Sequence, residues 1–117
     1  MTALHVPATR PGSRILSVGA SRGDLDVPND DLVGPIDSSD EWIRQRTGIV
    51  SRKRASAEQS LLDMAKAAAD EAIAKAGIEP AQIGAVIVST VSHHLATPSL
   101  ASLLADRIGA TPAAAYD

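Results

Sequence analysis

The stretch that decides the fold is Ala85-Val86-Ile87-Val88-Ser89, four apolar residues and a serine near the C-terminal end of the chain. Side chains on both faces of this run are apolar, which is typical of a central strand in a parallel sheet. A loop, Thr90 to Ala96, follows the run at its carboxyl end. In open α/β sheets this edge carries the functional loops, so the loop is a place to look for binding residues.

The residues after this loop predict a helix and a second strand. Thr97 and Pro98 have the residue types preferred at an N-cap and at the first helical position. The expected buried stripe of the helix consists of Leu100, Leu103, Leu104 and Ile108. Gly109 ends it, and Ala113 to Tyr116 predict another strand. Strand, helix and strand in this order predict a right-handed parallel crossover, hence an α/β fold.

The residues before the stretch extend the same pattern. Ser60 to Ala76 predict a long helix that ends at Gly77, with an alanine-rich stripe formed by Leu61, Ala65, Ala68, Ala72 and Ala76. Ile15 to Ala20 predict a first, buried strand, and Ser21 to Pro28 predict a polar loop. The whole order is then strand, helices, strand, helix, strand, as in one α/β domain.

Two short helices are expected between the first strand and the long helix. Asn29 is the expected N-cap of the first, which Gly34-Pro35 stop. In the second, Ser38 and Glu41 have the spacing of a capping box, and Gly48 can close the helix. This second helix is highly charged and carries the only Trp of the chain, Trp42.

The amino-acid composition argues against several kinds of site and of binding partner. The 117 residues include no Cys, so disulfides, thiolate zinc sites and thiolate nucleophiles are excluded within them. A net charge of −3 with dispersed Lys and Arg argues against a general nucleic-acid or membrane-surface binder. Residues 1–12 are interpreted as a flexible leader, not a secretory signal, and residues 13–117 as the domain. A cytoplasmic location follows by default.

Candidate binding residues are few. Trp42 and Arg46 are four residues apart and share one face of the expected helix. Together they could stack on an adenine ring and bind a phosphate, but Trp42 could equally seal the edge of its helix against the body. His93 and His94 are adjacent, and no acidic or Cys cluster lies near them, so no metal site is expected.

A resemblance to a known family rests on residues 37–49. They read Asp37-Ser38-Ser39-Asp40-Glu41-Trp42-Ile43-Arg44-Gln45-Arg46-Thr47-Gly48-Ile49. This run closely resembles a signature of the β-ketoacyl-acyl-carrier-protein synthase III family. Segments 15–19, 29–32, 76–78, 86–90 and the surroundings of Thr97-Pro98 also fit the family's pattern. The similarity extends from about Ser13 to Asp117.

The resemblance implies a thiolase-like fold, usually in a homodimer, and a decarboxylating Claisen condensation that starts fatty-acid synthesis. The substrates would be an acyl-CoA primer and malonyl-acyl-carrier-protein, with no cofactor and no metal. By resemblance, Trp42 stacks on the CoA adenine and Arg46 helps to bind CoA, while Thr47 and Ser38 are weaker candidates. Thr97 would help to line the primer pocket of the partner subunit, and its small size predicts tolerance of longer or branched primers.

The chain also departs from the family's pattern. Loop Ala20 to Gly23 lacks a Tyr-x-Pro sequence often found there, and none of the family's catalytic Cys, His and Asn is present. The sequence is therefore interpreted as an incomplete, N-terminal part of a synthase III, inactive alone and only partly folded or prone to aggregate. The alternatives are a non-catalytic module that binds CoA or a partner, and a synthase III relative that acts in polyketide biosynthesis.

Overall fold

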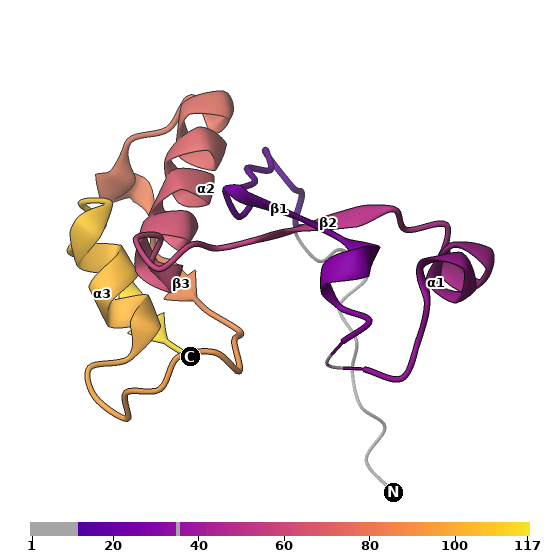
Figure 1. The fold of residues 1–117 in the computed structure, drawn as a ribbon. Coiled ribbons are helices and arrows are strands. Elements are labelled where there is room, and N and C mark those ends of the chain that lie inside the picture. Colours follow the sequence, from indigo (N-terminus) through magenta and orange to yellow (C-terminus); the bar gives the residue numbers. More distant parts are fainter. Residues whose placement is uncertain (1–11, 35) are drawn as a thin grey trace, which may run out of the picture.

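The computed structural model describes residues 12–34 and 36–117, so the expected leader falls almost wholly outside the described residues. Its elements, in chain order, are β1 (Leu25–Pro28), η1 (Asn29–Asp31), α1 (Asp40–Thr47), β2 (Ser51–Arg54), α2 (Leu61–Ala76), η2 (Pro80–Gln82), β3 (Ala85–Ile87), α3 (Leu100–Arg107) and β4 (Ala114–Tyr116). Figure 1 shows two groups of elements, with α2, α3 and β3 on one side and η1 and α1 on the other.

The predicted strand–helix–strand unit is confirmed. β3 and β4 pair in parallel, with Ala85 opposite Ala114 and Ile87 opposite Tyr116. α3 covers one face of this pair, and α2 packs beside it (Figure 1). The core that results consists of small and branched apolar residues, namely Val86, Ala101, Leu104, Ala105, Ile108 and Ala110. The chain has no Phe, so the elements approach closely around alanines.

The long helix also forms as predicted, between Leu61 and Ala76. The Ser60 hydroxyl caps it by accepting a hydrogen bond from the Asp63 amide, at 3.1 Å. Gly77 ends it in the left-handed conformation, at φ 65°, which a residue without a Cβ adopts without strain. Four partly buried residues of α2 pack against the core: Leu62, Ala65, Ala69 and Ile73.

The predicted cap of α3 is wrong. Ser99, not Thr97, is the N-cap, and its hydroxyl accepts from the Ser102 amide at 3.2 Å. The carboxylate of Asp117 accepts from the amides of Leu100 and Ala101, at 2.8 and 2.7 Å. These acceptors satisfy the free amides of the first turn, so the helix begins after Pro98.

The segment 15–20 is not the buried strand that its apolar residues predict. It has no regular secondary structure and pairs with no strand of residues 12–34 and 36–117, and Ile15 and Val18 are 85% and 71% exposed. Its polar groups bind α2 instead, where the Ser17 hydroxyl donates to the Ala72 carbonyl at 2.6 Å. A Cβ on Gly19 would lie only 2.0 Å from the Ala68 carbonyl oxygen, so glycine permits this close approach.

The expected loop over 21–28 is partly wrong, because its second half forms β1. β1 pairs antiparallel with β2, whose sequence is Ser51-Arg52-Lys53-Arg54. Lys53 lies opposite Asp26, and its ammonium is 2.8 Å from the Asp26 carboxylate. β1 alternates apolar and polar residues only over Leu25 to Val27, and β2 has no apolar residue, so the usual sequence signal of a half-buried strand is too short in one strand and missing in the other.

One face of the β3–β4 pair is open in the described residues, as expected of an incomplete sheet, although side chains on both faces of β3 are apolar. Val86 is 8% exposed beneath α3, whereas Ile87 and Tyr116, on the other face, are 68% and 51% exposed. Val91 and Leu95, in the following loop, are exposed as well. This structure therefore leaves a considerable part of its apolar surface in water.

We expect the isolated 117-residue chain to melt broadly. Its exposed apolar side chains contribute nothing to the free energy of folding, so the core around α3 is small for cooperative unfolding. Far-UV circular dichroism should show helix at low temperature that is lost gradually on heating, and a hydrophobic dye should bind before the transition. A sharp transition without dye binding would contradict this prediction.

Candidate functional site

The candidate site is built on α1, a helix of eight residues. Ser39 is its N-cap and accepts from the Trp42 amide at 3.1 Å, so the predicted capping box of Ser38 with Glu41 is wrong. Gly48 ends the helix with φ 72°, as predicted. Ile43 is the residue of α1 that is buried, and it attaches the helix to the rest of the chain.

Trp42 and Arg46 lie together on the outer side of α1. The Arg46 guanidinium carbon is 5.5 Å from the centre of the Trp42 ring, within the range of a cation–π contact. The Trp42 side chain is not sealed against the body, because the residue is 55% exposed. An open aromatic face beside a guanidinium can stack on a flat ring and bind an anion.

A buried amide, Asn29, connects α1 to the β1–β2 pair. Asn29 is 1% exposed, and its Nδ2 donates to the Asp40 carboxylate at 2.7 Å and to the Ile49 carbonyl at 2.8 Å. Its Oδ1 accepts a hydrogen bond from the Arg52 guanidinium. Asn29 is thus the first residue of η1 and not the predicted N-cap, because Pro28 holds that position.

Asp40 is the charged partner of this amide. The Arg44 Nε lies 2.9 and 2.8 Å from its two carboxylate oxygens, one turn along α1. The hydrogen bond from Arg44 first, and that from Asn29 second, hold the pKa of Asp40 below its ordinary value of 3.8. The carboxylate also lies in the first turn of α1, where a negative charge is favourable.

The other predicted binding residues have different surroundings. Thr47 is exposed, but its hydroxyl donates to the Ile43 carbonyl at 2.7 Å and accepts from the Ile49 amide at 3.0 Å. The Ser38 hydroxyl is buried and has no hydrogen-bond partner in the described part of the chain. Thr97 is exposed in the loop between β3 and α3, in the group of elements away from α1. The structure therefore brings Trp42 and Arg46 together but leaves Thr97 apart.

Two further sequence features take no part in this site. His93 and His94 have ring centres 6.3 Å apart, and the His93 Nε2 lies 3.2 Å from the Pro98 carbonyl oxygen. Within residues 12–34 and 36–117, no group of three or more His, Cys, Asp or Glu could hold a metal ion.

No helix in the same residues is both long and apolar enough to cross a membrane.

The contacts among Asn29, Asp40 and Arg44 predict how the stability of α1 depends on pH. Because folding lowers the pKa of Asp40, its ionised form stabilises α1 above pH 3.8, and this stability is lost as the pH falls through the folded pKa. Arg44→Gln should raise the pKa of Asp40 toward its ordinary value, measured by NMR titration of its carboxyl carbon. Arg46→Gln, which removes the same charge beside Trp42, should leave it unchanged; equal effects of both variants would refute the assignment.

Several known proteins are similar to this chain in sequence, although no family model matches. β-Ketoacyl-[acyl-carrier-protein] synthase III of Kocuria rhizophila is 56% identical over 105 residues, which are 90% of this chain and 30% of the relative. The Tropheryma whipplei enzyme of that name is 50% identical over 90% of this chain and 33% of its own length. The chain therefore spans about a third of the relatives it matches.

Solved structures give the same result for the fold. The priming β-ketosynthase of the R1128 polyketide biosynthetic pathway superposes with a TM-score of 0.83 at 37% identity, over 95% of this chain and 34% of that one. The 3-oxoacyl-[acyl-carrier-protein] synthase III of Aquifex aeolicus has the same TM-score at 34% identity, over 91% and 34%. Over about 90% of its length, the chain is similar in sequence and in fold to β-ketoacyl-[acyl-carrier-protein] synthase III enzymes, which are thiolase-like condensing enzymes, and it spans about a third of their length.

Proposed function

We propose that this chain is the CoA-binding part of a β-ketoacyl-[acyl-carrier-protein] synthase III, which condenses an acyl-CoA primer with malonyl-acyl-carrier-protein. One observation carries the assignment of the site, namely the exposed Trp42 ring with the Arg46 guanidinium 5.5 Å from its centre. A planar, electron-rich ring beside a fixed positive charge is complementary to an adenine nucleotide. The relatives named synthase III support the reaction.

In this proposal, the adenine of CoA stacks on the open face of Trp42 and Arg46 binds a phosphate oxygen. The Asn29 amide keeps α1 in place through Asp40 and Ile49, so the ring and the guanidinium are positioned before the nucleotide arrives. Thr47 is a weaker candidate because its hydroxyl already donates to a carbonyl. Ser38 is weaker too, because its oxygen is buried.

The chain has no Cys, so it supplies no thiol to take the acyl group from CoA. In the proposed reaction, a Cys thiolate outside these residues attacks the acyl-CoA carbonyl and releases CoA. Malonyl-acyl-carrier-protein then loses CO₂, and the carbanion that forms attacks the acyl-enzyme and releases the thiolate. These 117 residues would bind the primer's nucleotide and would not catalyse the condensation alone.

Binding of CoA to the 117-residue chain tests the site. Trp42 is the only Trp, so its fluorescence reports directly on this helix. CoA should quench the fluorescence saturably, whereas pantetheine, which lacks adenine, should not. Trp42→Ala should weaken CoA binding, measured by calorimetry, about 5- to 150-fold, the equivalent of ~1–3 kcal/mol of stacking.

A matched pair of arginine variants separates a specific contact from general electrostatics. Arg46→Gln should weaken CoA binding, whereas Arg44→Gln removes the same charge two residues away, where the guanidinium binds Asp40. Circular dichroism of each variant controls for loss of α1. Equal losses in both variants, or pantetheine quenching as strong as that by CoA, would rule out the proposed stacking site.

A second candidate function is priming of a polyketide pathway. It is supported by the similarity to the priming β-ketosynthase of the R1128 pathway, at 37% identity. Both functions start from an acyl-CoA, and the choice of primer would distinguish them. The third alternative is a non-catalytic module that binds CoA. In that case, a longer protein that contains these residues should bind CoA but catalyse no condensation.

Thr97 is proposed to determine primer size from the loop between β3 and α3 in a homodimer. In a longer protein that contains these residues, Thr97→Phe should fill space and lower kcat/KM for branched or longer acyl-CoA more than for acetyl-CoA. Thr97→Val, which has nearly the same shape, should preserve the ratio. A strict preference for acetyl-CoA in the unmodified protein would overturn this role.

A further inference from the structure

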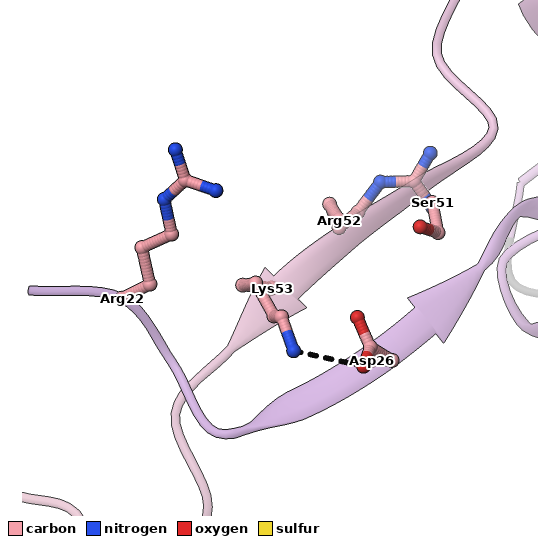
Figure 2. Close-up of a pocket in the computed structure, with 5 residues that line it drawn as sticks. All are labelled: Arg22, Asp26, Ser51, Arg52 and Lys53. Atoms are coloured by element: carbon pink, nitrogen blue, oxygen red, sulfur yellow. Dashed lines mark hydrogen bonds and ion pairs between the residues drawn. The ribbon is translucent and has the colours of Figure 1, made fainter.

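A positively charged hollow lies on the β1–β2 pair (Figure 2), and neither Trp42 nor Arg46 lines it. Its volume is about 470 Å³. It is lined by Arg22, Asp26, Ser51, Arg52 and Lys53. Three cationic side chains and one carboxylate line this hollow, although the chain as a whole has a net charge of −3. This local excess of positive charge attracts anions.

The structure holds part of this positive charge in a fixed position. Arg52 donates to the Oδ1 of Asn29, which is 1% exposed, and its Nη1 lies 3.5 Å from the Val27 carbonyl oxygen. An arginine held by a buried amide loses less conformational entropy on binding a ligand than a free surface arginine.

The other two cations remain available for an anion. Arg22 projects from the segment before β1 and forms no ion pair with any described residue (Figure 2). Lys53 pairs with Asp26 across the two strands, but their side chains are 39% and 69% exposed. Ion pairs exposed to this degree contribute little and exchange partners readily.

We propose that this hollow binds a phosphate dianion, either free phosphate or the phosphate group of a nucleotide. Two guanidiniums, an ammonium and the Ser51 hydroxyl provide donors on several sides, and guanidinium groups bind phosphate oxygens in bidentate fashion. The three cations outnumber the one carboxylate, Asp26, so a ligand with two negative charges gains more in this hollow than a monocarboxylate does. This site involves neither Trp42 nor Arg46 and does not depend on the proposed CoA site.

Titration of the ¹⁵N-labelled chain with inorganic phosphate tests the proposal. The amide signals of Arg22 and of residues 51–53 should shift saturably, and acetate at the same ionic strength should shift them less. Arg22→Gln should weaken phosphate binding about fivefold or more, the effect of losing one charge-assisted contact. Asp26→Asn should tighten it about two- to fivefold, because it removes the one carboxylate of the hollow.

Arg54→Gln is the matched control, since Arg54 is on β2 but does not line the hollow. It should leave phosphate binding within about twofold, the range expected of a screened charge outside the site. Circular dichroism and the dispersion of amide signals establish that each variant keeps its fold. Equal effects of Arg22→Gln and Arg54→Gln, weaker binding in Asp26→Asn, or no saturable shift would each overturn the proposal.

CoA and 3′-dephospho-CoA distinguish the two sources of the anion. If the hollow takes the 3′-phosphate of CoA, Arg22→Gln should weaken CoA binding and leave dephospho-CoA binding unchanged. If the hollow takes free phosphate instead, Arg22→Gln should leave the binding of both CoA and 3′-dephospho-CoA unchanged. Trp42→Ala should abolish stacking but not phosphate binding, so failure of the CoA site and failure of the hollow give different results.

Discussion

The hydrogen bonds of the Asn29 amide connect the parts of this protein that could bind a ligand. A buried amide without partners costs about 1–3 kcal/mol, and here both its oxygen and its nitrogen are satisfied. The three partners come from α1, from the residue after its Gly cap, and from β2. The orientation of α1, with Trp42 and Arg46, and the position of Arg52 therefore follow from the same side chain.

The core of the α2–β3–α3–β4 group depends on a different constraint, close packing between small residues. Alanines of α2 and α3 and the strand residue Val86 allow the helices to approach the sheet, which compensates for the absence of Phe. Gly19 likewise allows the segment 15–20 to lie close to the backbone of α2. At the other end, the Asp117 carboxylate joins β4 to the first turn of α3 through two amides.

The correct predictions rest on patterns among residues close in the sequence, whereas the errors about strands concern contacts between distant residues. The long helix, the helix ends at Gly77 and Gly48, and the parallel strands were predicted correctly, because periodicity and capping act between residues a few positions apart. The β1–β2 pair, by contrast, joins residues more than 20 positions apart, and β2 has no apolar residue. The segment 15–20 resembles a buried strand in composition, but it bonds to a helix.

The same distinction applies to the candidate site, where some features follow from the local sequence and others from the tertiary structure. The sequence alone determined that Trp42 and Arg46 share a helix face, since four residues make about one turn, and its motif indicated a resemblance to the synthase III family. The tertiary structure alone decided that Asn29 binds Asp40 and Arg52, and that Arg22 lies beside β2 to form a cationic hollow. These contacts depend on where the chain returns in space, which no local pattern of residue types encodes.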